Sequence, residues 1–164
     1  MTRSRDHLYR LLGEAQAAYA RCIDDDHFEA WPDFFVERCR YVVTTADNYA
    51  HGLPAGLIYA DSRAMLKDRV AALREANVYE SHSYRHILAM PFVREHNALD
   101  DGTDIVACET GFLVARIMRT GETTLFATGR YIDRYRIEND RPLIEERLVV
   151  CDSSKIDTLL ALPL

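Results

Sequence analysis

Residues 105–137, IVACETGFLVARIMRTGETTLFATGRYIDRYRI, predict two long β-strands joined by a tight turn. Thr120-Gly121-Glu122-Thr123 between the two arms is typical of a hairpin. Both faces of the first arm are apolar: one carries Ile105, Ala107, Leu113, Ala115 and Ile117, and the other carries Val106, Cys108, Phe112, Val114 and Met118. A strand of this kind is central and covered on both sides. We expect helices to cover one face and a partner chain to cover the other.

The second arm alternates between basic and aromatic residues. Arg130, Arg134 and Arg136 share one face, opposite Tyr131, Tyr135 and Ile137. Arginines in a row on a strand usually form a solvated surface with cross-strand partners. After a turn at 139–142, a last strand over 144–152 supplies Glu145 and Arg147 as the expected neighbours on that surface.

The chain before this hairpin is mostly helical. Apolar residues at three- and four-residue steps predict a helix over 6–23, and residues 28–35 predict a short aromatic helix with Pro32 in its first turn. A strand is expected at 40–45, a loop at 46–60, and a helix at 62–76 that buries Leu66, Val70 and Leu73. Residues 85–93 are extended, with Pro91 indicating an edge or a bulge, and 97–104 form a turn.

Helices first and strands last indicate an α+β fold, in which a mainly antiparallel sheet packs on the helices. If the sheet curves around the first helix, the result is a cone of the NTF2-like (cystatin-like) type. The 164 residues suffice for one domain, and we expect a single domain over 1–164.

Composition excludes several functional classes. The formal charge is -6 and there is no long basic run, which argues against a nucleic-acid role. No apolar run has the length of a membrane helix and the N-terminal segment lacks an apolar signal core, so we expect a cytoplasmic protein and no membrane partner. The four cysteines (Cys22, Cys39, Cys108 and Cys151) form no CxxC pair and are expected to be buried and reduced.

The sequence offers little for a metal or a nucleotide. His82 and His86 have the spacing of two helical metal ligands, but their segment is strand-like, which separates the rings too far for one ion. No CxH…CxxH pattern, phosphate-binding glycine loop or GxSxG motif is present. We therefore expect no metal, no cofactor and no catalytic motif in this chain.

A cone of this type can nevertheless hold an active site built from Asp, Tyr and His. Six side chains are candidates to converge inside it: Tyr19, Tyr41, Tyr49, Asp24, Asp33 and His86. The alternative is that the tyrosines and the histidine fill the cone as core residues whose polar tips are hydrogen-bonded. Sequence spacing leaves both interpretations open.

The last residues, SSKIDTLLALPL, are unusually apolar for a chain end. Leu159, Leu160, Leu162 and Leu164 either fold back on the sheet or cover a neighbouring subunit, and the two alternatives are equally favoured.

Four blocks in order along the chain resemble a known family. They are AAYARCIDDDHFEAWPDFF (17–35), residues 40–91, RIMRTGETTLFATGRYID (116–133) and ERLVVCDSSKIDTLLALPL (146–164). Together they resemble the small (β) subunits of Rieske-type aromatic-ring-hydroxylating dioxygenases. Within the family, YADSRAML, ALREANVYE, YRHILAMP and IMRTGET are most similar to the terephthalate-dioxygenase members.

The resemblance implies an NTF2-like structural subunit without a cofactor of its own. In this family the large (α) subunit holds the Rieske [2Fe–2S] cluster and the mononuclear iron, small subunits associate into a trimer within an α3β3 hexamer, and a separate reductase supplies electrons from NAD(P)H. The implied reaction of the whole component is cis-dihydroxylation, with O2, of an aromatic carboxylate such as terephthalate. The alternatives are a free-standing NTF2-like isomerase or dehydratase and a small-ligand binding protein.

Overall fold

A computed structural model describes residues 3–53, 56–76, 80–155, 160 and 162–164 of the chain. Its helices are α1 (Arg5–Asp24), the 3-10 helix η1 (Phe28–Phe34), α2 (Ala46–Ala50) and α3 (Arg63–Ala76). Its strands are β1 (Phe35–Thr45), β2 (Ile58–Ala60), β3 (His82–Leu88), β4 (Phe92–Ala98), β5 (Asp104–Met118), β6 (Thr123–Glu138) and β7 (Arg141–Cys151).

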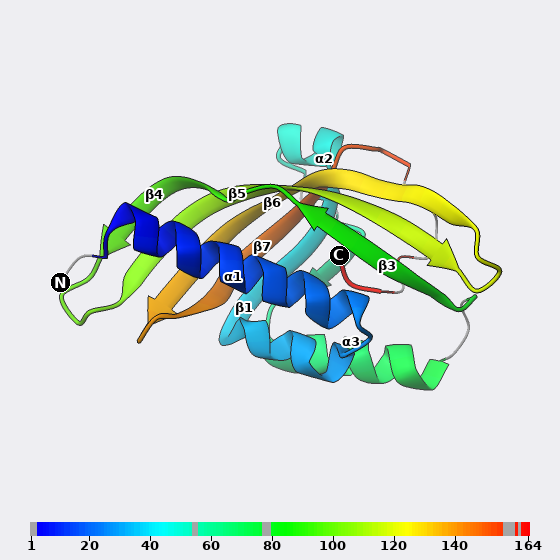
Figure 1. Cartoon of the computed structure of the whole chain (residues 1–164), viewed down its shortest axis with the longest axis horizontal. Coiled ribbons are helices and arrows are strands. Elements are labelled where there is room, and N and C mark those ends of the chain that lie inside the picture. The colour runs from blue at the N-terminus through cyan, green and yellow to red at the C-terminus, as the bar shows by residue number, and fades with distance from the viewer. Residues whose placement is uncertain (1–2, 54–55, 77–79, 156–159, 161) are drawn as a thin grey trace.

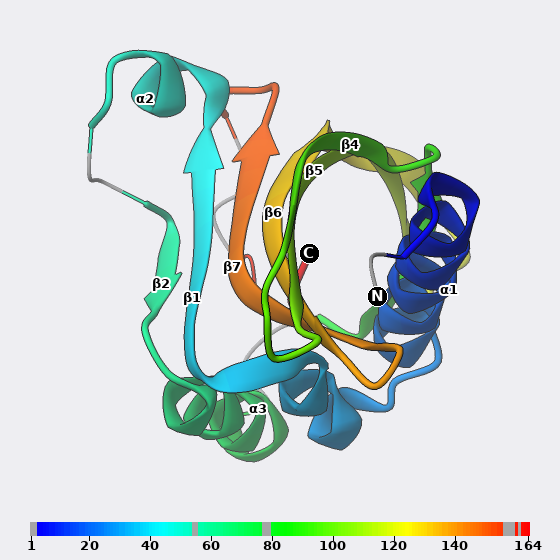
Figure 2. The ribbon, with the colours of Figure 1, turned by 90° about the vertical axis from the view of Figure 1, so that its left-hand side faces the viewer.

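The strands form one curved sheet, and α1 lies along its concave side (Figure 1). The strand order is β2-β1-β7-β6-β5-β3, and β4 pairs with the other half of β5. Neighbouring strands are antiparallel except β1 and β7, which run parallel. Seen end-on, β4, β5 and β6 arc over towards α1, so that sheet and helix enclose a cone (Figure 2). This is the α+β cone that the sequence predicts.

Helix α1 forms where the apolar periodicity predicts it and turns that face into the cone. The Ser4 hydroxyl caps its start by accepting a hydrogen bond from the His7 amide at 3.3 Å. Leu8, Leu12, Tyr19 and Ile23 are buried against the sheet. The helix stops at the aspartate run, where Asp26 adopts a positive φ of 61°.

Two segments differ from the sequence-based expectation. The expected loop at 46–60 contains the short helix α2 and the edge strand β2, which pairs with β1. The single extended segment expected at 85–93 is two strands, β3 and β4, and Pro91 lies in the connection between them. A proline lacks the amide hydrogen that a continuous ladder requires, so the chain leaves the sheet at that point.

A β-bulge in β7 overturns the expectation for Arg147. Arg134 on β6 pairs with Glu146 whereas Tyr135 pairs with Ile144, so Glu145 is an extra residue on β7. Because an extra residue shifts the alternation of faces, Glu145 joins the outer arginines while Arg147 turns into the cone. Glu145 is 2.8 Å from Arg134, as expected, but Arg147 is fully buried.

The packing of β6 against β7 predicts a sensitive glycine. A Cβ at Gly129 would collide with the Val150 carbonyl oxygen and lie 3.0 Å from the Phe112 ring. We expect Gly129→Ala to lower the free energy of unfolding by about 1–3 kcal/mol, the range for an overpacked core, as measured by urea denaturation.

Gly13 in α1 is the matched control. A Cβ there meets nothing within 4 Å, and alanine favours a helix interior over glycine by about 0.5–1 kcal/mol. Gly13→Ala is therefore expected to be neutral or stabilising. Equal stability of Gly129→Ala and the wild type would show that β6 and β7 do not approach as closely as described.

Candidate functional site

Two of the predicted cone tyrosines meet inside the cone. Tyr19 on α1 and Tyr41 on β1 are both fully buried, and their hydroxyls donate to the Leu164 carbonyl oxygen at 2.8 and 3.1 Å. The Tyr41 hydroxyl also lies 3.1 Å from the Leu164 amide nitrogen, which donates to it. Burial raises the pKa of both phenols, so they act as neutral hydrogen-bonding groups.

The centre of the cone is occupied by Arg147. Its guanidinium carbon lies 4.1 Å from the ring centroids of both Tyr19 and Tyr131, so the cation is in contact with two aromatic rings that meet edge to face. The Asp133 carboxylate accepts two hydrogen bonds from it, each at 2.8 Å. Burial is the largest influence and lowers the pKa of Arg147, but the charge and hydrogen bond of Asp133 together with Tyr135 and Tyr19 outweigh it, and the pKa lies well above its usual value.

A buried hydrogen-bond network completes the arginine site. The Gln16 amide nitrogen donates to Asp133 at 2.9 Å and to the Thr110 hydroxyl at 3.1 Å, and its carbonyl oxygen accepts from Arg147 at 2.7 Å. Arg147 also donates to the Tyr135 hydroxyl at 3.1 Å. The cone is thus filled by a connected core of aromatic and polar side chains.

The sequence pattern does not predict this network. The pattern places Arg147 on the solvated surface and assigns no role to Asp133 or Gln16. One signal was available: Arg147 is followed directly by the apolar run Leu148-Val149-Val150. A charged side chain at the start of such a run is costly to bury without a partner. The run therefore indicates that Arg147 has a buried carboxylate as its partner.

His86 and Asp24 form a separate buried pair at the C-terminal end of α1. The His86 Nδ1 and the Asp24 Oδ1 are 2.6 Å apart, and the His86 amide donates to the other carboxylate oxygen at 3.0 Å. Both side chains are almost fully buried. As the sequence predicts, His82, Tyr84 and His86 lie in a row on one face of β3, with neighbouring ring centroids 5.3 and 6.0 Å apart.

Two of the candidate side chains do not enter the cone. Tyr49 lies on α2, is 39% exposed and packs against Arg130, which faces away from the buried Tyr131. Asp33 lies on η1 and is exposed. The prediction that all six candidates converge is wrong for these two, because η1 turns Asp33 outward and α2 covers the outer side of the sheet.

Three of the four leucines in the last segment lie among the described residues. Leu162 and Leu164 are buried in the core of their own chain, and Leu160 is half-buried against it. Leu159 lies outside the described residues. Leu162 and Leu164 therefore fold back onto their own chain. A subunit interface at Leu160 stays a prediction.

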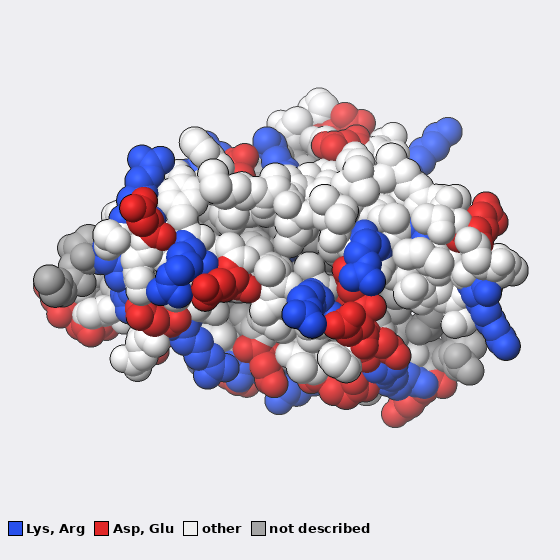
Figure 3. Space-filling view, viewed as in Figure 1, with Lys and Arg blue, Asp and Glu red and all other residues white. Residues whose placement is uncertain are grey.

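The convex side of the sheet carries exposed apolar side chains on β3, β4, β5, β6 and the β3–β4 connection. They form the outer-face patch: Ile87, Met90, Phe92, Leu113 and Leu125, with exposed fractions between 39 and 77%. Ile87 pairs directly with Leu113, and Leu125 pairs with Ala115 two residues further along β5. In Figure 3, uncharged surface covers much of the upper half of the view, where these strands lie. This is the face of β5 that the sequence left for a partner.

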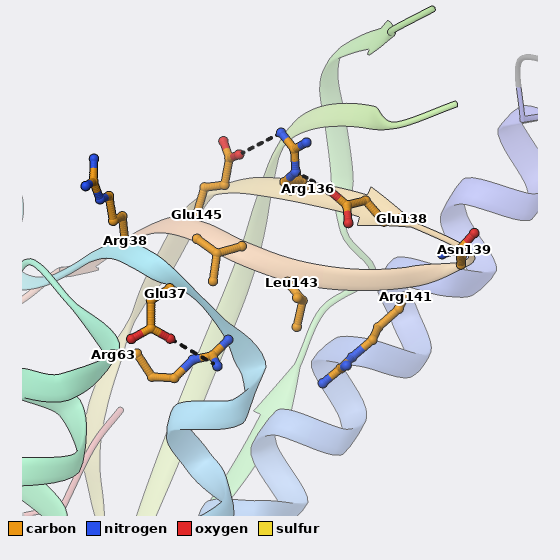
Figure 4. Close-up of a pocket in the computed structure, with 10 residues that line it drawn as sticks. Glu37, Arg38, Arg63, Arg136, Glu138, Asn139, Arg141, Leu143 and Glu145 are labelled. Atoms are coloured by element: carbon orange, nitrogen blue, oxygen red, sulfur yellow. Dashed lines mark hydrogen bonds and ion pairs between the residues drawn. The ribbon is translucent and has the colours of Figure 1, made fainter. Parts of the chain in front are cut away.

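A charged groove opens where β1 enters the sheet (Figure 4). Between Phe35 and Arg40, β1 advances five residues while β7 advances only two, from Ile144 to Glu146. The resulting groove has a volume of about 630 Å³. Its lining is Val36, Glu37, Arg38, Arg63, Arg136, Glu138, Asn139, Arg141, Leu143 and Glu145.

The arginines of the charged groove do not converge on one point. Arg63 is 3.5 Å from Glu37, and Arg136 is 2.5 Å from Glu138. Arg38 and Arg141 point in different directions in Figure 4. An anion at the centre of the groove would therefore not be held by several guanidinium groups at once.

The four cysteines are buried and free. Burial raises the pKa of Cys22 and Cys39 to about 11 and that of Cys151 to about 12, so these thiols are unreactive at neutral pH. Among the residues that the structure describes, no three His, Cys, Asp or Glu side chains are grouped so that they could hold a metal ion. Within the same part of the chain, no helix has the length and apolarity needed to cross a membrane.

Comparison with known proteins gives a consistent result. The model of the family described as "Ring hydroxylating beta subunit" matches residues 18–158. Two terephthalate 1,2-dioxygenase terminal oxygenase component subunits, beta 1 and beta 2 of Comamonas sp, are each 49% identical over 148 residues, covering 90% of this chain and 93% of theirs.

Two further relatives, with lower sequence identity, are also small or beta subunits of dioxygenases. The anthranilate 1,2-dioxygenase small subunit of Burkholderia cepacia is 33% identical, with 91% of this chain and 89% of that protein covered. A solved structure, the beta subunit of a candidate aromatic-ring-hydroxylating dioxygenase from Novosphingobium aromaticivorans, superposes with a TM-score of 0.86 at 35% identity, covering 96% of this chain and 97% of that one.

The buried Arg147–Asp133 pair predicts large losses of stability when only one partner is removed. Arg147→Met leaves an uncompensated carboxylate in the core, and Asp133→Ala leaves an uncompensated guanidinium. Each is expected to lower the free energy of unfolding by about 3–5 kcal/mol, measured by urea denaturation. The double variant Arg147→Met/Asp133→Leu should lose less than the sum, because neither buried charge remains.

Arg134→Ala provides the surface control, since Arg134 pairs with Glu145 in an exposed position. It should cost less than about 1 kcal/mol. If Arg147→Met cost no more than Arg134→Ala, the arginine would not be a central element of the core.

Proposed function

Since the chain belongs to the family of ring-hydroxylating dioxygenase beta subunits, we propose that it serves as the small structural subunit of a terminal oxygenase component and carries no catalytic group itself. In this proposal the large subunit holds the Rieske cluster and the mononuclear iron, and a reductase delivers electrons from NAD(P)H to the assembled component. The reaction is cis-dihydroxylation of an aromatic carboxylate with O2.

The observation that carries the non-catalytic role is the filled cone. The positions that could bind a substrate are taken by Tyr19, Tyr131 and Arg147. The two rings meet edge to face, and the guanidinium carbon lies 4.1 Å from the centre of each. The neighbouring side chains of Asp133 and Gln16 form hydrogen bonds with Arg147 and with each other, and Gln16 also binds Thr110. A substrate could enter the cone only by displacing these core side chains, and their displacement would lower the free energy of unfolding.

The substrate class rests on the relatives. The Comamonas subunits, at 49% identity, belong to a terephthalate dioxygenase, and the Burkholderia subunit, at 33%, belongs to an anthranilate dioxygenase. Both substrates are benzene rings with carboxylate groups. We propose terephthalate or a close benzene carboxylate as the substrate of the whole component.

The filled cone argues against the alternative of a free-standing isomerase or dehydratase. That function requires an open pocket in which Tyr19, Tyr41 and His86 reach a ligand together. Instead, the hydroxyls of Tyr19 and Tyr41 are bonded to the Leu164 main chain, and His86 is bonded to Asp24 at the other side of α1.

The outer-face patch supports association with another chain. Apolar patches of this kind on a soluble protein commonly mark interfaces. Large exposed side chains such as Phe92 and Met90, at 62 and 77% exposure, gain most from burial, at roughly 25 cal/mol per Å² of apolar surface. We propose that the large subunit covers this patch in an α3β3 hexamer.

Co-expression tests the proposal directly. The chain and its cognate large subunit, with a tag on the large subunit only, should co-purify as one complex whose mass is measured by native mass spectrometry. Leu113→Asp places a charge in the middle of the patch and should abolish or strongly weaken co-purification, because a buried unpaired charge costs several kcal/mol.

Leu99→Asp is the matched control. Leu99 is 43% exposed at the end of β4, outside the patch, so this change should leave the complex intact. A wild-type chain that stays separate from a fully active and stable large subunit would refute the proposed function. A complex that tolerates Leu113→Asp would refute only the placement of the interface.

A further inference from the structure

A second groove lies between α1 and the β3–β4 connection, and Gln16 of the cone network is also part of its lining. Its volume is about 420 Å³, within the range of small-molecule sites. Gly13, Ala17 and Ala20 line its helix side. Because these side chains are small, the helix leaves space beside the strand, and a Cβ added at Gly13 would meet nothing within 4 Å.

The opposite wall of this α1–β3 groove is apolar. Leu88, Ala89, Met90 and Pro91 line it where β3 leaves the sheet. At least one main-chain group of this wall has a hydrogen-bond partner within the protein, since the Ala89 amide donates to the Gly111 carbonyl at 2.9 Å. The middle of the groove therefore offers two apolar walls, which suit a flat hydrocarbon ring.

One end of the groove is polar and basic. Arg21, Asp24, Arg85 and His86 line it, so two guanidinium groups face one carboxylate. Asp24 is already engaged by His86 at 2.6 Å and lies 3.7 Å from Arg85. Arg21 is 80% exposed and lies 3.9 Å from Asp25, and Arg85 is 61% exposed. Each guanidinium thus has one long contact with a carboxylate and keeps N–H groups that can donate to a further anion.

His86 belongs to the floor of the polar end. Its Nδ1 is engaged by Asp24 at 2.6 Å, and its side chain is fully buried. Its Nε2 atom, which has no hydrogen-bond partner among the described residues, is shielded from the open groove. The groups that can reach a ligand at this end are therefore the two exposed arginines.

We propose that the α1–β3 groove binds a small aromatic carboxylate. The ring lies between Ala17 on the helix and Leu88 on the strand side, and the carboxylate lies at the end formed by Arg85 and Arg21. This site is separate from the catalytic site that the proposed function assigns to the large subunit, and the inference does not rest on that function.

A titration of the isotopically labelled full-length chain with benzoate tests the proposal. Amide chemical shifts are followed by NMR, and benzamide serves as the neutral molecule of the same shape. We expect saturable shifts confined to residues 13–24 and 85–91. Benzamide and the variant Arg85→Gln should each weaken binding by about two- to fivefold, the size of one exposed charge contact.

Gly13→Phe places an aromatic ring in the groove, starting from a Cβ that meets nothing within 4 Å, and should abolish the benzoate shifts. Arg134→Gln, an equally exposed arginine outside the groove, is the matched control and should bind like the wild type. Benzoate shifts that do not saturate at about 10 mM, equal binding of benzamide, or unchanged binding by Gly13→Phe would each overturn the proposal. Because the large subunit is absent, these outcomes are independent of whether the two chains assemble.

Discussion

The contact of the Arg147 guanidinium with Asp133 and with the rings of Tyr19 and Tyr131 is the interaction on which the interior of this protein depends. A fully buried cation is tolerated only when its charge and its hydrogen-bonding groups find partners. Here Asp133 supplies the charge and Gln16 and Tyr135 supply further oxygens. These residues come from α1, β6 and β7, so one guanidinium group connects the helix to the centre of the sheet.

The same interaction explains why the cone is a core. Asp133, Gln16 and Tyr135 form hydrogen bonds with Arg147, although the Arg147 Nη1 atom and the Tyr131 hydroxyl have no hydrogen-bond partner among the described residues. Tyr41 and Tyr19 are occupied by the Leu164 main chain, and Leu162 and Leu164 are buried beneath them. The chain has an interior built for stability and an outer face, centred on Leu113, that is left apolar and exposed. That division suits a subunit whose chemistry takes place in another chain.

Much of the fold could be predicted from local sequence signals. The periodicity of α1 and α3, the hairpin turn at Gly121 and the apolar faces of β5 each depend on neighbouring residues, so they appear in the sequence without tertiary information. The strand character of 82–88 also placed His82 and His86 too far apart to share a metal ion, in agreement with the observed ring spacings.

The candidate site was harder to predict because it depends on register. One extra residue at Glu145 turns Arg147 into the cone, and nothing in the alternation of residues 144–152 locates that bulge. Tyr49 was misplaced for a similar reason, since the short helix α2 has no periodicity long enough to recognise. The outer-face patch and the Asp24–His86 pair are each formed by residues that lie far apart in the sequence. Only the folded sheet brings those residues next to one another.

The central claim is that the cone is a structural core and takes no part in the chemistry of the assembled oxygenase. Its most direct test is the turnover number of the complex that carries Tyr19→Phe and Tyr41→Phe, which removes the two cone hydroxyls that bind the Leu164 carbonyl while keeping their rings. The account predicts an intact complex with turnover within about twofold of the wild type, since uninvolved side chains leave the barrier unchanged. A loss of a hundredfold or more in a complex of unchanged mass, the size expected for removal of an acid or base group, would contradict it.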